Sequence, residues 1–249
     1  MLFDCHAHLD LLEEEALKEI LERADASGVA KIISCATSFS SNEKNLCLAQ
    51  QYKQIAPALG LYPLDALELN DAELEKAFTF FEENVRKGIA IGEVGMDYKY
   101  AKSDAEKEKQ KNVFERFIAL ALRENKPLIV HSRFAQKQVL DSLITQNAKK
   151  VLLHTFVDSQ KLMALAAEKD YFVSVGLSVL HNEEVQKNIT AFPLENLLFE
   201  TDAPVRFSGR EAEPGDVKEI AEKVAELKEI TFLEVQAAQE KNYKALFKP

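Results

Sequence analysis

Short apolar segments alternate with longer amphipathic segments along the whole chain, and this alternation constrains the fold more than any other feature. After a first strand that ends at His6 and His8, apolar segments cover residues 31–35, 55–60, 89–93, 127–131, 151–154, 171–175 and 197–200. Each has the length and composition of a buried strand. Parallel strands need crossover helices between them, so eight strand–helix units predict a (β/α)8 TIM barrel.

The amphipathic segments space their apolar residues as helices do. Residues 104–125 are the clearest case, and further helices are expected around 17–24, 42–53, 71–87 and 216–229. Thr231 and Glu234 have the spacing of a capping box for a last helix that ends near residue 246. A doubly wound open sheet is the alternative, but it usually carries a glycine-rich loop after its first strand. With no linker or repeat in the sequence, we expect one domain over residues 1–249.

Composition narrows the class of protein. A net charge of −10 argues against a surface that is basic throughout, as many nucleic-acid or membrane-binding proteins have. The cysteines, Cys5, Cys35 and Cys47, form no Cys-x-x-Cys pair, and we expect buried, reduced thiols. No apolar stretch approaches the roughly 20 residues of a membrane span, and no signal peptide precedes the first strand. The sequence therefore predicts a cytoplasmic protein with no membrane partner.

Four of the five histidines lie at the carboxyl ends of predicted strands. Two acids occupy matching places, and in a barrel all six ends meet at one mouth, where active sites are built. Each residue alone is as readily explained as a buried histidine or a strand-end acid, but their coincidence indicates a metal site. The six candidate ligands are His6, His8, Glu93, His131, His154 and Asp202.

Strand periodicity supports this convergence. Side chains alternate faces along a strand, so residues two apart share a face. We therefore expect each candidate ligand to share the barrel's inner face with another residue, usually apolar. The expected sets are Leu2, Asp4, His6 and His8; Ile91 and Glu93; Ile129 and His131; Leu152 and His154; and Leu198, Glu200 and Asp202.

The motifs that carry these residues resemble those of the TatD-related hydrolases of the amidohydrolase superfamily. The resemblance runs nearly from end to end and rests on DCHAHLD at 4–10, GLYP at 60–63, GEVGMDY at 92–98, HSR at 131–133, HTF at 154–156, ETDAP at 200–204 and NYKALF at 242–247. It implies a metal-dependent barrel hydrolase of a family usually described as deoxyribonucleases. By this resemblance His6, His8 and Asp202 bind one divalent ion and His131 and His154 a second, with Glu93 bridging them.

The chemistry of the residues agrees with that assignment. Imidazoles and carboxylates without cysteine suit catalytic Zn²⁺, Mn²⁺ or Mg²⁺. Two such ions can activate water against a phosphodiester and give an acidic protein a positive pocket for DNA, with RNA as a further candidate substrate. Asp202 can also take the proton of that water, so Glu93 and Asp202 are the expected catalytic carboxylates.

Other residues are candidates for supporting roles. Asp10, Asp97 and Glu200 can orient ligating histidines through the second ring nitrogen, or can be ordinary loop and capping acids. Arg133 and Arg210 can hold a phosphate bidentately; the alternative, which we favour slightly for Arg210, is a surface ion pair. The role of Arg206 stays open between these two. His181 belongs to no motif, and we expect a structural or exposed side chain.

The chain departs from the family pattern in two places. Tyr62 stands where the family usually has histidine, and a phenol with an ordinary pKa of ~10 cannot carry a positive charge. We expect Tyr62 to contact the substrate or, alternatively, to pack beside Pro63. Asp158 either adds negative charge near the mouth or, as we favour, caps the next helix.

These observations favour a deoxyribonuclease that acts on DNA ends. An alternative is hydrolysis of an amide or carboxylic ester, including an aminoacyl ester on RNA, because the same ions polarise carbonyl groups. A non-catalytic, metal-containing scaffold is a third interpretation, and the intact ligand set argues against it.

Overall fold

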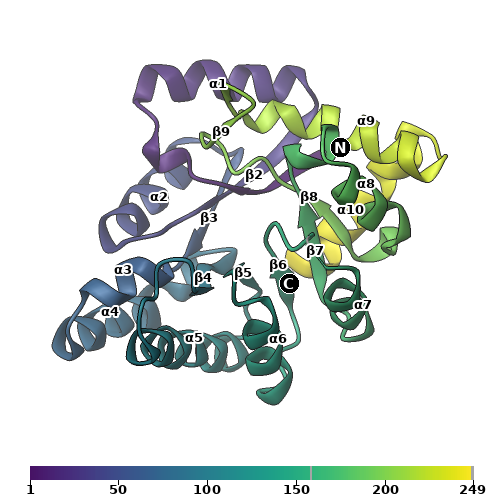
Figure 1. Cartoon of the computed structure of the whole chain (residues 1–249). Helices are drawn as coiled ribbons and strands as arrows, with labels where there is room; N and C mark the ends of the chain where they lie inside the picture. The colour runs from purple at the N-terminus through teal and green to yellow at the C-terminus, as the bar shows by residue number, and fades with distance from the viewer. Residues whose placement is uncertain (158, 248–249) are drawn as a thin grey trace.

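The structure is a computed structural model that describes residues 1–157 and 159–247. It confirms the TIM barrel, because eight parallel strands follow one another in chain order with helices on the outer side (Figure 1). The strands are β1 (Leu2–Ala7), β2 (Val29–Cys35), β3 (Ile55–Leu59), β4 (Ala90–Asp97), β5 (Leu128–Arg133), β6 (Val151–Leu153), β7 (Phe172–Val175) and β8 (Leu197–Phe199).

The two edge strands meet at their carboxyl ends, where the barrel nearly closes. The backbone amide of Asp202 donates to the carbonyl of His6 at 2.9 Å, and that of His8 donates to the carbonyl of Ala203 at 2.6 Å. The buried carboxylate of Asp4 accepts the Thr201 amide at 3.1 Å and the Thr201 hydroxyl at 2.5 Å. This seam places the end of β1 beside the segment that follows β8.

Helix boundaries follow the local capping residues. The helix expected from residue 42 begins at Phe39, because Ser38 and Ser41 form a capping box. The Thr231–Glu234 capping box is confirmed. The helices are α1 (Glu14–Ala26), α2 (Phe39–Gln51), α3 (Pro63–Glu68), α4 (Asp71–Asn84), α5 (Asp104–Glu124), α6 (Gln136–Thr145), α7 (Gln160–Glu168), α8 (Glu183–Ala191), α9 (Val217–Lys228) and α10 (Phe232–Phe247). The short helix α3 and a hairpin of β9 (Arg206–Phe207) and β10 (Arg210–Glu211) were not predicted.

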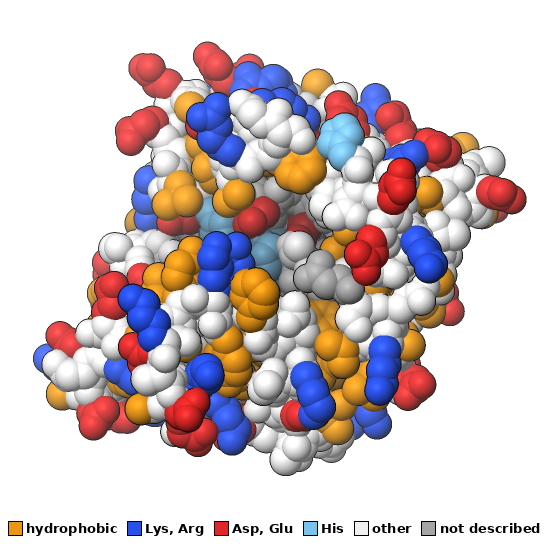
Figure 2. All heavy atoms as spheres, in the orientation of Figure 1, with side chains coloured by type: hydrophobic (Ala, Val, Ile, Leu, Met, Phe, Trp, Pro, Cys, Tyr) orange, Lys and Arg blue, Asp and Glu red, His pale blue; other side chains and the backbone are white. Residues whose placement is uncertain are grey.

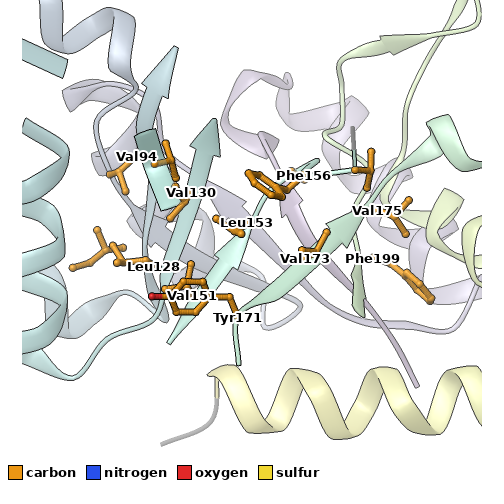
Figure 3. Packing of buried hydrophobic residues seen from close by; sticks show 14 of the residues in the cluster. Val94, Leu128, Val130, Val151, Leu153, Phe156, Tyr171, Val173, Val175 and Phe199 are labelled. Carbon is orange, nitrogen blue, oxygen red and sulfur yellow. The ribbon is translucent and has the colours of Figure 1, made fainter. Parts of the chain in front are cut away.

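Two apolar clusters make up the core. The larger lies between the outer faces of the strands and the helices, and Figure 3 shows part of it, including Val130, Leu153 and Val175. The smaller joins residues from seven strands to the end of α10, as expected for side chains inside the barrel: Phe3, Cys5, Ile33, Cys35, Ala58, Ala90, Ile129, Leu152, Leu198, Tyr243, Leu246 and Phe247.

The expected strand periodicity is wrong on β1 and β4. Leu2 and Ile91 belong to the outer cluster, so they do not share the inner face with the candidate ligands of their strands. The register shifts between Asp4 and Ala7 on β1 and between Ile91 and Val94 on β4. Such bulges add one residue and redirect the side chains that follow. Ile129, Leu152 and Leu198 do lie in the inner cluster, as predicted.

Three further expectations have different outcomes. Cys5 and Cys35 are buried and unpaired, but Cys47 is exposed on α2, so the expectation of burial was wrong for Cys47. Asp158 lies outside the described residues, and the side chain of Ser159 caps α7 by accepting the amide of Leu162 at 3.4 Å. Among the described helices, none is both long and apolar enough to span a membrane.

Candidate metal centre

The six candidate ligands lie together at the carboxyl ends of the strands. His6 lies near the end of β1 and His8 just after it, Glu93 and His131 lie within β4 and β5, and the segments that follow β6 and β8 supply His154 and Asp202. Figure 2 shows histidine and acidic side chains at the bottom of a hollow on this face, with cationic and hydrophobic side chains on its rim. The sequence prediction that these ends converge therefore agrees with the geometry.

The first half of the cluster combines the two histidines of β1 with Asp202. The Nε2 atoms of His6 and His8 are 3.2 Å apart. Asp202 Oδ1 lies 3.5 Å from His6 Nε2 and 3.2 Å from His8 Nε2. These three ligand atoms surround a common point at nearly equal spacing.

The second half contains His131 and His154. Nδ1 of His131 lies 2.8 Å from Glu93 Oε1, and Nε2 of His154 lies 3.9 Å from the same oxygen. The His154 ring also stacks on the His6 ring, with centroids 3.7 Å apart, so the two halves are in direct contact.

Glu93 lies between the halves and presents one oxygen to each. Its Oε2 is 3.6 Å from His6 Nε2 and 3.5 Å from His8 Nε2, whereas its Oε1 faces His131 and His154. The bulge on β4 makes this orientation possible, because Glu93 points inward although Ile91 points outward. A carboxylate whose two oxygens face different pairs of histidines can bridge two cations.

The spacing of the ligand atoms fits a divalent ion. Four ligands at the roughly 2.0–2.1 Å typical of zinc form a tetrahedron with edges of roughly 3.3 Å. The separations of 3.2–3.6 Å around His6 and His8 match this edge length. Three overlapping groups have potential ligand atoms that all lie within 4.8 Å of one another: His6, His8 and Glu93; His6, His154 and Asp202; and Glu93, His131 and His154.

The electrostatics of the site favour cations. Burial alone would lower the pKa of His8, but Asp202 and Glu93 raise it to about 9. Burial likewise opposes protonation of His154, but the Glu200 carboxylate raises its pKa to about 10. Burial raises the pKa of Glu93, yet the surrounding histidines hold it below its ordinary value. The carboxylates therefore remain ionised and attract protons or metal ions to the imidazoles.

Carboxylates hold the histidines of the second half. Glu200 Oε2 lies 2.9 Å from His154 Nδ1, and Glu200 also accepts the hydroxyl groups of Ser174 and Thr155. Asp97 Oδ2 lies 3.3 Å from His131 Nε2. Both contacts match the expected orienting role, since a ligating imidazole needs a partner on its second nitrogen.

Tyr62 is part of this arrangement and not of the outer rim. Its hydroxyl donates to Asp97 Oδ2 at 2.7 Å and lies 3.3 Å from His131 Nε2. Burial and the bond to Asp97 raise the pKa of Tyr62, so the phenol stays neutral. The Tyr62 hydroxyl thus contacts the carboxylate behind His131, and its contact with substrate stays a prediction.

The first half is held differently. Nδ1 of His8 lies 2.9 Å from the backbone carbonyl of Cys35 at the end of β2. Asp10 accepts Asn45 Nδ2 at 3.5 Å, a contact that agrees with the alternative of an ordinary loop acid. Nδ1 of His6 is buried without a hydrogen-bond partner among the described residues.

Asp202 has an unusual backbone. Its φ of +58° lies in the left-handed region, which non-glycine residues seldom adopt and which costs roughly 1–3 kcal/mol when imposed. The seam hydrogen bonds to His6 and Ala203 hold this segment in place. The fold thus keeps Asp202 Oδ1 beside the β1 histidines at a local energetic cost.

The arginines predicted as phosphate contacts lie in different surroundings. Arg133 is exposed at the end of β5, and its charge partly offsets the rise in the pKa of Tyr62, so it lies near the second half. Arg210 instead forms a bidentate pair with Asp216 at 2.7 and 3.0 Å, the surface alternative. Arg206 donates to Gly209 within the hairpin, and His181 is exposed against Phe207.

Sequence reasoning missed several supporting groups. The Cys35 carbonyl has no signature in the sequence, because any residue offers the same acceptor. Ser174 and Thr155 become visible only when β6, β7 and β8 are placed side by side. Asp4 had a usable signal, since a charged residue inside an apolar strand needs a buried partner, which is Thr201.

Comparison with known proteins gives the family of the chain. The family model described as TatD related DNase matches residues 3–248. The chain belongs to the TatD-related DNase family. It is 34% identical to the uncharacterized metal-dependent hydrolase YabD of Bacillus subtilis, over 100% of this chain and 99% of that protein. It is 32% identical to human deoxyribonuclease TATDN3, over 99% of this chain and 94% of that protein.

A solved structure agrees with this assignment. The TatD homologue YJJV of Escherichia coli superposes with a TM-score of 0.90 at 28% identity, covering 100% of this chain and 98% of that one. The TatD-related chain is accordingly a metal-dependent hydrolase of this family, and the His, Glu and Asp cluster at its mouth could hold a metal ion.

Proposed function

We propose that the protein is a two-metal phosphodiesterase that hydrolyses DNA at its ends. The supporting observation is Glu93, whose two oxygens face two separate groups of histidines. Human TATDN3, the related protein named above, is called a deoxyribonuclease, which favours DNA over other esters.

We assign the ligands by half. His6, His8 and Asp202 would hold one divalent ion, His131 and His154 would hold the other, and Glu93 would bind both. When bound, zinc, manganese or magnesium would supply positive charge that polarises the phosphodiester and acidifies water.

The chain's own groups would then position substrate and move protons. Asp202 has an ionised carboxylate at the mouth, because the neighbouring histidines hold its pKa well below the ordinary value despite burial. It would accept the proton of the attacking water. Arg133, exposed at the rim near Tyr62, would bind a phosphate of the DNA end.

We also propose that residues 1–249 act as one unit in the cytoplasm. The inner cluster joins β1 to α10 across nearly the whole chain, and Cys5, Cys35 and Cys47 are unpaired thiols. Unpaired thiols are typical of reducing compartments.

An activity panel tests the function. The purified protein is assayed on a 3′- or 5′-labelled DNA oligonucleotide, a matching RNA, a carboxylic ester and an aminoacyl ester, each with and without EDTA. We expect cleavage of terminal nucleotides that EDTA abolishes and added metal restores. EDTA-sensitive turnover of the carboxylic esters alone would overturn the phosphodiesterase proposal, and absence of any turnover would favour a metal-containing scaffold.

A further inference from the structure

A second cavity opens at the opposite end of the barrel, where the strands begin. Its volume is about 1050 Å³, and it is lined by the first residues of β1, β2 and β3, the turns before β4, β5 and β6, and the end of α10. The candidate metal ligands lie at the other ends of these strands. The cavity is therefore separate from the proposed active site.

The floor of this cavity is apolar. Phe3 and Tyr243 stack with their ring centroids 4.0 Å apart, and Phe247 lies 5.2 Å from Tyr243. These rings belong to the inner cluster of the barrel, so the floor is an extension of the core. Pockets of this size with apolar walls are typical of small-molecule sites.

Lysines surround the floor. The cavity lining contains six lysines, whereas Glu124 is its one carboxylate among the described residues: Lys31, Lys53, Lys87, Lys126, Lys150 and Lys244. Glu124 is itself paired with Arg86 at 3.0 Å and Arg123 at 3.5 Å. In a chain of net charge −10, this end of the barrel concentrates positive charge.

Little of that charge is neutralised. Lys244 pairs with Glu240, and within the described part of the chain none of the other five has an ion-pair partner. Lys31, Lys126 and Lys150 donate to backbone carbonyls, and Lys87 donates to the Asn84 side chain at 2.7 Å. Burial lowers the pKa of Lys126; the Glu124 carboxylate partly offsets this effect, and the charge of Lys150 adds to it.

Capping of carbonyl groups explains only part of the arrangement. Hydrogen bonding to backbone carbonyls explains why Lys31, Lys126 and Lys150 lie here. That role explains neither the cavity itself nor the other lysines in its lining. Lys53 and Lys87 are exposed at the rim, and among the described residues neither donates to a strand carbonyl. Positive charge without ion-pair partners around an apolar floor is complementary to a ligand that has an anionic head group and an apolar body.

We propose that this cavity is a binding site for a small amphiphilic anion, a hydrocarbon chain that ends in a phosphate or phosphonate. The chain would lie on Phe3, Leu246 and Phe247, and the head group would meet the lysines. A hydrocarbon is favoured over a nucleobase, because the aromatic and aliphatic floor offers few side-chain partners for the donors and acceptors of a base.

Calorimetric titration of the metal-loaded protein tests this site. The probes are hexyl-, octyl- and decylphosphonate below their micelle concentrations, with methylphosphonate as head group alone and dAMP as a phosphate with a nucleobase. Affinity should rise with chain length by up to about fourfold per buried methylene, the factor that corresponds to about 0.8 kcal/mol. Methylphosphonate should bind weakly or not at all.

Two variants locate the binding. Lys53→Gln with Lys87→Gln removes two exposed charges at the rim and should weaken octylphosphonate binding by about tenfold. Lys137→Gln with Lys218→Gln removes two exposed charges elsewhere and should have no effect. Any binding of the phosphonate at the candidate metal centre should be the same in the two double variants, so a difference between them reports on the cavity.

Three results would overturn the proposal: no binding of octylphosphonate, affinity that does not depend on chain length, or equal affinity in the two double variants. Tighter binding of dAMP than of octylphosphonate would overturn the choice of a hydrocarbon body. None of these outcomes depends on whether the protein cleaves DNA.

Discussion

The two halves of the candidate metal centre hold their histidines by different means. In the half formed by β1 and Asp202, the partner of His8 is the backbone carbonyl of Cys35. In the half formed by β5 and β6, the partners of His131 and His154 are the carboxylates of Asp97 and Glu200. A carbonyl fixes the ring without adding charge, whereas a carboxylate also makes the ring more basic.

This difference predicts where each half is sensitive. The carboxylate-supported half should respond to side-chain substitutions behind its ligands. The other half depends on backbone placement, namely the seam between β1 and β8 and the end of β2. Glu93 belongs to both halves and should be the most sensitive position.

Glu93→Gln should have the largest effect. The amide keeps the shape but loses the charge that both halves share, so metal content should fall and turnover should decrease by at least about 100-fold. Steady-state kinetics and metal analysis of the folded variant measure both. Wild-type turnover with two ions per chain would show that the halves do not share this residue.

Metal affinity should increase with pH in both halves. The pKa values of about 9 for His8 and about 10 for His154 mean that the metal-free site holds protons at neutral pH. Each displaced proton should strengthen apparent metal binding by about tenfold per pH unit below these pKa values. Titrations between pH 6 and 9 measure the slope, and a flat profile would show that no histidine proton is displaced.

The same pKa values predict the stability of the metal-free protein. Both are raised above the ordinary value of ~6.5, so protonation stabilises the folded state below that pH. This contribution should disappear as pH rises through about 9 to 10. The melting temperature in EDTA should therefore fall between about pH 6.5 and pH 10, whereas added metal should offset the fall.

Glu200→Gln should distinguish the halves by a smaller effect. It weakens support for His154, so affinity for one ion should fall by roughly 10–100-fold while the other stays bound. Cys35→Ala is the matched control, because it removes a thiol but keeps the carbonyl that faces His8. Equal loss of both ions in Glu200→Gln would contradict a separation between halves.

Tyr62→Phe should have a modest effect confined to the carboxylate-supported half. It removes one hydrogen bond to Asp97, on the order of 1 kcal/mol or about fivefold in metal affinity or turnover. Tyr98→Phe is the control, since that hydroxyl contacts Met96 instead. A change in KM for DNA with unchanged metal affinity would return Tyr62 to the substrate contacts.

His181→Ala should have the smallest effect, with activity within about threefold of wild type. Its exposed ring stacks on Phe207, which belongs to the β9–β10 hairpin. Neither residue belongs to the two halves of the candidate metal centre. Kinetics under saturating metal check this, and a larger loss in a folded variant would reveal a further substrate or metal contact.

The sequence predicted the barrel and the convergence of the ligands because both follow from strand periodicity and strand ends. The same periodicity failed at Leu2 and Ile91, since a bulge is a property of pairing between strands and not of one strand. The inward turn of Glu93 is therefore a tertiary feature. For the same reason, sequence patterns could not show that Cys35 offers its carbonyl to His8.

Contacts of long side chains were harder to predict. The sequence placed Glu200 and Asp97 near the histidines because both lie at strand ends. Asp10 also lies at a strand end, but its loop directs it toward Asn45. Arg210 forms an ion pair with Asp216, six residues further along the chain. Such choices depend on loop geometry that no periodic pattern encodes.

The central claim is that the mouth of the barrel holds two ions in two separable halves. Metal analysis of wild type and His154→Ala at saturating metal tests it most directly. We predict two ions per chain for wild type and one for His154→Ala, held by His6, His8 and Asp202. Retention of two ions by the variant, loss of both, or a single ion in wild type would contradict the account.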